Sequence, residues 1–143
     1  APAYCSATGK AMLAYAPEDT ISAASANMQR FTRHTVSSAA MLRRQLATIR
    51  EQGYSMTNGE WREGVLGFGR AILSPSERAI AAIGVAGPEE RVRQGGVEKY
   101  VSALLAAGEA IETALGFRNA PIGQEAAPAG MPKAPQRQSK KRS

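Results

Sequence analysis

The chain has 143 residues, with 18 lysines and arginines against 12 aspartates and glutamates, and its net charge is +6. Most of this charge lies at the C-terminus. Residues 1–117 carry 12 basic and 11 acidic side chains, a net +1, whereas residues 118–143 carry 6 and 1, a net +5. A basic patch spread over the folded body is therefore a poor explanation of the charge, because the body is close to neutral.

Length and composition limit the class of protein further. About 117 residues suffice for one domain and one core, and no apolar run approaches the roughly 18 residues that span a bilayer. No signal peptide is visible, and the single cysteine, Cys5, cannot form an internal disulfide. We therefore expect a cytoplasmic protein. The sequence has no Cys/His cluster at metal-ligand spacing and no Walker-type loop, so we expect no metal and no cofactor.

Helical signals dominate the first third of the chain. A short helix is predicted after Gly9, with Ser6 or Thr8 as its N-cap. Pro17 suits the first position of a second helix, which we expect to run to about Met28.

The segment 31–36 is predicted to be an extended connection. The clearest helix follows, with Ser37 as its N-cap and Gly53 as its C-cap. Its apolar residues fall on one face of a 3.6-residue period: Leu42, Leu46 and Ile49.

Strand signals follow a turn at Asn58-Gly59. Residues 64–72 and 79–86 predict two strands joined by a hairpin-like connection over 74–78, and Gly87-Pro88 is expected to stop the second. A long helix is predicted from about Gly96 to Leu115, with a buried side that comprises Val97, Tyr100, Val101, Leu104, Leu105, Ile111 and Leu115. Residues 118–143 are rich in proline and basic side chains and are predicted to be disordered.

The two strands share a face with little side-chain volume. Side chains alternate along a strand, and if Gly67 opposes Gly84, then one face carries only small residues and Val65. The other face carries the large residues: Leu66, Phe68, Ile83 and Val85. Two explanations remain open for the small face. A helix can pack closely on it, or a cavity above it can hold a small molecule.

Four single residues invite alternative interpretations. Arg70 could bind a ligand carboxylate, but we favour an ion pair or a snorkelling stem. Trp61 could cover a cavity, form a dimer contact or simply be half-buried beside a turn. Cys5 and His34 could be a nucleophile and its base, but no third partner orients them, and a packed cysteine is the favoured interpretation.

Several motifs in this order resemble the effector-binding domain of the IclR family of bacterial transcription regulators. They are Ala7-Thr8-Gly9-Lys10-Ala11-Met12-Leu13-Ala14, Ile49-Arg50-Glu51-Gln52-Gly53-Tyr54, Asn58-Gly59-Glu60 with Gly64-Val65, and Val85-Ala86-Gly87-Pro88. The resemblance covers about residues 2–116. It implies an α+β fold similar to GAF and PAS domains, with a curved antiparallel sheet and flanking helices.

The resemblance also implies partners and a site. The partners would be a small organic or aromatic acid as effector and further copies of the chain in a homodimer or tetramer, with no membrane. Carried over by position, the ligand contacts would be Ser6, Ala7, Thr8, Thr57, Val65, Gly67, Gly84 and Ala86. Family members that recognise small keto acids carry an acid, a thiol and hydroxyls where this chain has Thr57, Gly67, Gly84 and Ala86. We therefore predict a wider, less polar pocket and an effector larger than a two- or three-carbon acid.

In the family, a winged helix-turn-helix, a linker helix and the first strands of the sheet precede the segment that begins at Ala1. We accordingly expect an effector-binding domain over residues 1–117 that is truncated at its N-terminus, followed by the tail. It would sense a ligand and touch DNA only through the winged helix-turn-helix domain. Two rivals remain: an enzyme that uses the same pocket, and a nonspecific nucleic-acid binder that acts through the tail.

Overall fold

The structure is a computed structural model that describes residues 1–119. The predicted disordered tail lies outside these residues, apart from its first two. The elements, in chain order, are a short 3-10 helix, η1 (Ala3–Cys5), the α-helices α1 (Ala7–Leu13), α2 (Glu18–Ala26) and α3 (Ala39–Gln52), the strands β1 (Ser55–Asn58), β2 (Val65–Leu73) and β3 (Ala79–Pro88), and the helices α4 (Glu89–Gly95) and α5 (Val97–Ala114).

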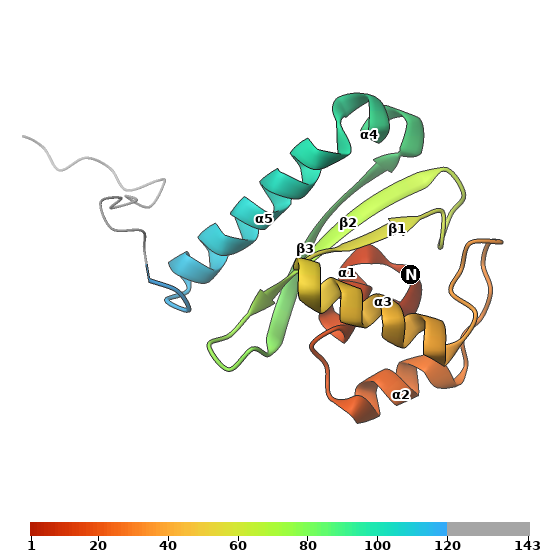
Figure 1. Cartoon of the computed structure of the whole chain (residues 1–143), viewed down its shortest axis with the longest axis horizontal. Coiled ribbons are helices and arrows are strands. Elements are labelled where there is room, and N and C mark those ends of the chain that lie inside the picture. The colour runs from red at the N-terminus through yellow and green to blue at the C-terminus, as the bar shows by residue number, and fades with distance from the viewer. Residues whose placement is uncertain (120–143) are drawn as a thin grey trace, which may run out of the picture.

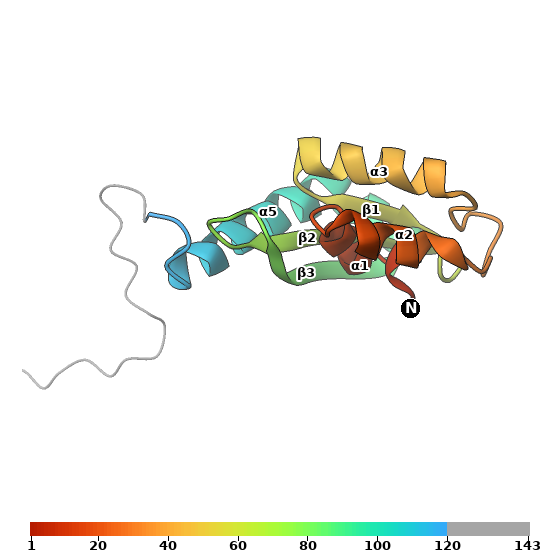
Figure 2. The same cartoon turned by 90° about the horizontal axis from the view of Figure 1, so that it is seen from below.

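The strands form an antiparallel sheet in the order β1-β2-β3, with helices on both of its faces. Helix α1 lies on one face with α2 and α3 beside it, and α5 crosses the other face (Figures 1 and 2). The first side encloses a core of Tyr4, Cys5, Leu13, Ala14, Ile21, Val36, Leu42, Leu46 and Ile49. The second encloses Leu66, Phe68, Val92 and Leu104. The α+β class with flanking helices is thus confirmed.

The predicted pairing of the two long strands is wrong by two residues. Gly67 opposes Ala86, and Gly69 opposes Gly84. The connection at 74–78 decides this register, because Ser74 N–H donates to the Arg78 carbonyl and Glu77 takes a positive φ of 60°. A shift of two residues leaves every side chain on its face, so the small face survives the error. The last strand also runs through Gly87 to Pro88 and does not stop before them.

Helix α3 begins one residue later than predicted. Its N-cap is Ser38 and not Ser37, because the Ser38 hydroxyl accepts the Met41 N–H at 3.1 Å. Ser37 directs its hydroxyl to the Met41 sulfur instead. At the other end Gly53 adopts a φ of 86° and caps the helix as predicted. The preceding segment 31–36 is bent and not extended, since the Thr35 hydroxyl accepts the N–H groups of Phe31 and Thr32.

The C-terminal half of α5 does not bury the predicted apolar side. Ile111 is 36% exposed and Leu115 is 51% exposed, while Glu112 is buried. The reason lies beneath the helix, where Arg70 of β2 occupies the sheet face and its Nη1 donates to Glu112 Oε1 at 2.7 Å. Helix α5 turns its acidic residue toward this cation, and the apolar residues on either side face outward. The predicted ion pair of Arg70 is confirmed.

Candidate functional site

A cavity of about 340 Å³ lies over the small face of the sheet, between the start of α1 and the ends of β2 and β3. All eight residues carried over by position line it: Ser6, Ala7, Thr8, Thr57, Val65, Gly67, Gly84 and Ala86. Residues that were not predicted complete the wall: Ala1, Cys5, Glu60, Trp61, Arg62, Phe68 and Val85. The strand positions among the eight, which the resemblance implied, lie on the small face that the period-two alternation predicted, although the register was wrong.

Both explanations of the small face hold, at different points along the strands. Helix α1 packs on Gly69, where an added Cβ would overlap the Ala7 carbonyl and lie 2.8 Å from the Thr8 nitrogen. At Gly67 an added Cβ would lie 3.5 Å from the Cβ atoms of both Ala7 and Ala86, an ordinary contact. The helix thus closes one part of the face, and the cavity occupies the part beside Gly67 and Ala86.

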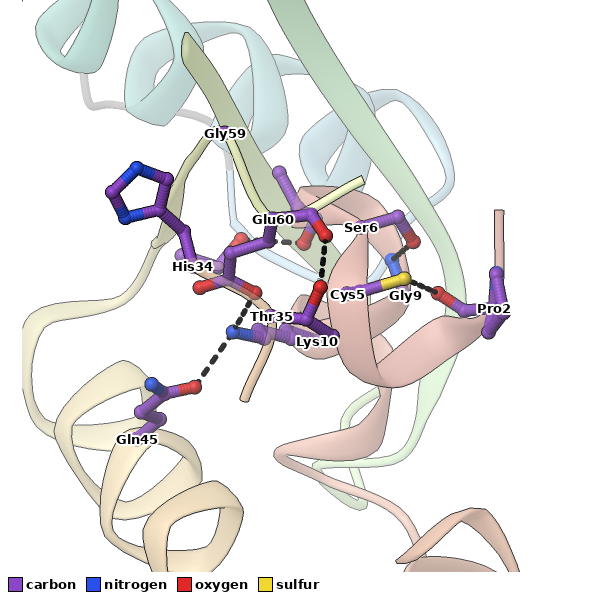
Figure 3. Close-up of polar contacts among 12 residues, drawn as sticks. Pro2, Cys5, Ser6, Gly9, Lys10, His34, Thr35, Gln45, Gly59 and Glu60 are labelled. Carbon is purple, nitrogen blue, oxygen red and sulfur yellow. Dashed lines mark hydrogen bonds and ion pairs between the residues drawn. The ribbon is translucent and has the colours of Figure 1, made fainter. Parts of the chain in front are cut away.

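The start of α1 is fixed against the sheet by short polar contacts. The Ser6 hydroxyl accepts the Gly9 N–H at 3.2 Å, which makes Ser6 the N-cap rather than Thr8 (Figure 3). The buried Ser55 hydroxyl on β1 donates to the Ala7 carbonyl at 2.5 Å. Gly9 is required here, because a Cβ would lie 2.6 Å from the Ala3 carbonyl oxygen. These contacts hold the cavity wall formed by residues 6–8 in place.

A buried ion pair supports the opposite wall. Lys10 of α1 is 1% exposed, and its ammonium group contacts the Glu60 carboxylate and donates to Gln45 Oε1 of α3 at 2.6 Å (Figure 3). The Thr35 hydroxyl donates to the Glu60 carbonyl at 2.7 Å. Burial lowers the pKa of Lys10, and the Glu60 carboxylate opposes that shift without cancelling it. The pair ties the segment after β1 to two helices. In the sequence, the only indication of this ion pair was a lysine, Lys10, among the mostly apolar residues of α1.

Trp61 lines the cavity next to this ion pair and is 37% exposed. Its ring centroid lies 4.5 Å from that of Phe31, at an interplanar angle of 59°. Phe31 in turn stacks on the buried Tyr4 at 6.5 Å. The indole is therefore held by an aromatic row at the cavity. This agrees with the first of the three interpretations of Trp61, while the dimer contact stays a prediction.

Cys5 and His34 are not arranged as a nucleophile and a base. The Cys5 thiol is buried and donates to the Pro2 carbonyl, and burial raises its pKa, so the thiolate is disfavoured. The exposed His34 ring accepts from Arg33 Nε and points away from Cys5 (Figure 3). Residues 1–119 also contain no group of three His, Cys, Asp or Glu side chains placed to hold a metal. No helix among these residues has the length and apolarity to cross a membrane.

Comparison with known proteins decides the family. The sequence model described as "Bacterial transcriptional regulator IclR C-terminal" matches residues 1–113. The chain belongs to the IclR family. The resemblance inferred from the sequence motifs is thereby confirmed, together with the domain of the family to which the chain corresponds.

The relatives give the extent of the IclR match. The transcriptional regulator SauR of Cupriavidus necator is 31% identical over 115 residues, which cover 78% of this chain and 46% of SauR. An IclR regulator from Silicibacter sp. TM1040 superposes with a TM-score of 0.76 at 25% identity, over 85% of this chain and 48% of that one. A double mutant of the inducer-binding domain of PobR from Acinetobacter, solved with 3-hydroxybenzoic acid, has the same fold, with a TM-score of 0.69 at 20% identity over 78% of this chain and 65% of its own. The chain spans about half the length of the curated relatives that it matches.

These relatives are named transcriptional regulators, and the chain corresponds to the C-terminal domain of that family. The rival in which the same cavity serves catalysis finds no support in them.

Proposed function

We propose that this domain is the effector sensor of a transcriptional regulator, and that its cavity binds an organic acid larger than a two- or three-carbon acid. The single observation that carries the proposal is the cavity over the small face of the sheet. Its volume of about 340 Å³ falls in the range of roughly 300–1,000 Å³ typical of small-molecule sites. The eight residues carried over by position would contact the effector.

The wall of the cavity favours an aromatic or acyl carboxylate over a compact polar acid. Gly67, Gly84 and Ala86 offer no polar side-chain atoms on the strands, while Trp61 offers an aromatic surface. Ser6 and Thr8 at the start of α1 and Thr57 on β1 carry the hydroxyls available for polar contacts. A double mutant of the PobR inducer-binding domain, which shares the fold, is solved as a complex with 3-hydroxybenzoic acid, an aromatic carboxylic acid.

Effector binding would regulate through a shift between quaternary states. In a homodimer or tetramer, an effector that binds one arrangement more tightly than another favours that arrangement. The winged helix-turn-helix domains of the full-length regulator would then change their spacing and their grip on DNA. The cavity suits this role because its walls come from α1, the sheet and the segment that Lys10 and Gln45 attach to α3.

Thermal-shift titration of the 143-residue chain tests the proposal. The panel pairs glyoxylate and pyruvate with benzoate, 3-hydroxybenzoate, phenylacetate and hexanoate. A ligand at 100 times its dissociation constant stabilises the fold by about 2.7 kcal/mol. We expect stabilisation by members of the larger group and little by the two small acids. Strong binding of pyruvate without binding of the larger acids would contradict the proposal.

A matched pair of variants shows whether the binding occurs in this cavity. Ala86→Leu adds bulk inside it, whereas Ala81→Leu adds the same bulk on an exposed position of the same strand that does not line it. We expect Ala86→Leu to weaken the acid at least tenfold and Ala81→Leu to leave it unchanged. Equal binding by all three chains would place the acid elsewhere.

A further inference from the structure

The charges around the cavity do not cancel. Two charged side chains line it, Glu60 and Arg62. The Glu60 carboxylate is already matched, because the buried ammonium group of Lys10 contacts it from behind the wall. A matched pair presents no net charge to a ligand, so Glu60 does not repel an anion as an isolated carboxylate would.

Arg62 differs from Glu60 because its guanidinium group has no acidic partner in the part of the chain that the structure describes. The neighbouring acid, Glu63, lies within 3.8 Å of Arg33 instead. Arg62 is exposed to solvent, lines the cavity and directly follows Trp61 in the chain. A planar guanidinium group can hold a carboxylate through two parallel hydrogen bonds.

We propose that Arg62 is the anchor for the effector's carboxylate and sets the effector's orientation, with the carboxylate at the rim and the apolar body against Trp61, Gly67 and Ala86. This inference rests on the proposed function and adds to it the residue that selects an acid over a neutral molecule. The ligand contacts implied by the family resemblance lie at the start of the first helix, on Thr57 and on the two long strands, and Arg62 is not among them.

The reverse orientation is less favourable. At the start of α1, the Ser6 hydroxyl already accepts the Gly9 N–H, and the helix has only seven residues. The strand residues that line the cavity are apolar apart from Thr57, and none carries a cation that could pair with a carboxylate. A carboxylate turned inward would lose its hydration without gaining a cationic partner, which is unfavourable for an unpaired charge.

The test compares an acid with its neutral amide in the 143-residue chain. Binding of benzoate, 3-hydroxybenzoate and phenylacetate is measured by calorimetry, next to benzamide, 3-hydroxybenzamide and phenylacetamide. In Arg62→Gln we expect the acids to bind about tenfold more weakly and the amides to bind as in the unsubstituted chain. Arg62→Lys keeps the positive charge but loses the two parallel hydrogen bonds of the guanidinium group, so its affinity for the acids should lie between those of the unsubstituted chain and Arg62→Gln. Added salt should weaken acid binding in the unsubstituted chain more than in Arg62→Gln.

Arg91→Gln is the matched control. It removes the same charge from an exposed site on α4 that does not line the cavity, so it should leave both ligand classes unchanged. Equal losses in Arg91→Gln and Arg62→Gln would overturn the proposal, since net charge would then explain the effect.

Two further outcomes are distinct. If Arg62→Gln binds the acids as tightly as the unsubstituted chain, Arg62 is not the anchor and the orientation proposed here is wrong. That result leaves the proposed function standing. If the unsubstituted chain binds no acid of either this panel or the larger one, the proposed function fails and the anchor fails with it.

Discussion

At the scale of single residues, the Lys10–Glu60 pair is the most consequential contact of the site. Both residues are buried. A buried ion pair adds little net stability, but removing one partner is strongly destabilising because the other charge stays buried and unpaired. Lys10→Met should therefore lower the free energy of unfolding by about 3–5 kcal/mol, because it leaves the Glu60 carboxylate buried without its cation. Lys10→Met with Glu60→Leu should recover much of the loss. Urea denaturation measures both, and a double variant no more stable than the single one would contradict the explanation.

The same lysine makes a prediction about pH. Burial lowers the pKa of Lys10 below its ordinary value of 10.5, so the folded chain releases this proton at a lower pH than the unfolded chain does. Between those two pH values the unfolded state binds more protons, and stability rises with pH. The free energy of unfolding of the unsubstituted chain minus that of Lys10→Met should accordingly increase as pH rises toward 10.5. Lys99→Met, at an exposed site on α5, is the control and should show no such trend.

At the scale of elements, the contact between α1 and the sheet decides how much of the small face stays open. The helix approaches so closely that glycine is required at Gly69, but not at Gly67. The cavity begins at the N-terminal end of α1, where the helix no longer covers the sheet. The size of the cavity is thus a consequence of where a seven-residue helix lies along two strands.

Two alanine substitutions on β2 separate these roles. Gly69→Ala forces α1 away from the sheet and should destabilise the fold by about 1–3 kcal/mol, the usual cost of overpacking. Gly67→Ala meets ordinary contacts except for the Thr57 hydroxyl at 3.1 Å, so its stability should change by less than about 1 kcal/mol while the cavity becomes smaller. Chemical denaturation compares the two. Similar losses in both variants would mean that α1 covers the whole face.

At the scale of the whole molecule, an ionic contact joins the sheet to the C-terminal helix. Arg70 of β2 pairs with Glu112 of α5, and the Glu112 carboxylate also accepts from the Leu73 N–H and forms a second ion pair with Arg118. An added Cβ at Gly108 would lie in the space of the Arg70 guanidinium group, so the helix crosses directly over the cation. Toward the N-terminus of α5, the apolar contact with the sheet is made by Val97, Tyr100, Val101 and Leu104.

The Arg70–Glu112 pair should account for much of the decrease in the free energy of unfolding at acidic pH. Burial opposes ionisation of Glu112, but the hydrogen bonds from Arg70 and from the Leu73 N–H outweigh it and lower its pKa below the ordinary 4.5. The stabilisation is therefore fully present above pH 4.5 and is lost as pH falls through the lower folded value. Glu112→Gln should be less stable than the unsubstituted chain at pH 7, and the difference should shrink as pH falls below 4.5. Glu109→Gln, which alters an exposed pair on the same helix, should show no comparable loss.

The errors of the sequence analysis have a common physical origin. Ser37 and Ser38 carry the same chemistry, and only the backbone path into α3 decides which hydroxyl reaches the Met41 N–H. Ile111 and Leu115 fit an apolar stripe, yet Arg70, 41 positions before Ile111 along the chain, turns a different side of α5 inward. Helix α4 was missed although Glu89 and Glu90 follow Pro88, since seven residues give too short a period to recognise.

The sequence by itself determined the properties that depend on neighbours along the chain. The helices with strong caps, the two strands, the faces of those strands and the eight positions that line the cavity follow from periods of 3.6 and 2, and from motifs that name the family. The tertiary structure alone decided the register, the ion pairs Lys10–Glu60 and Arg70–Glu112, and the place of Trp61 and Arg62 at the cavity. These features depend on contacts between residues that are far apart in the sequence. The energetic effect of a charged side chain depends on the partner that folding places beside it.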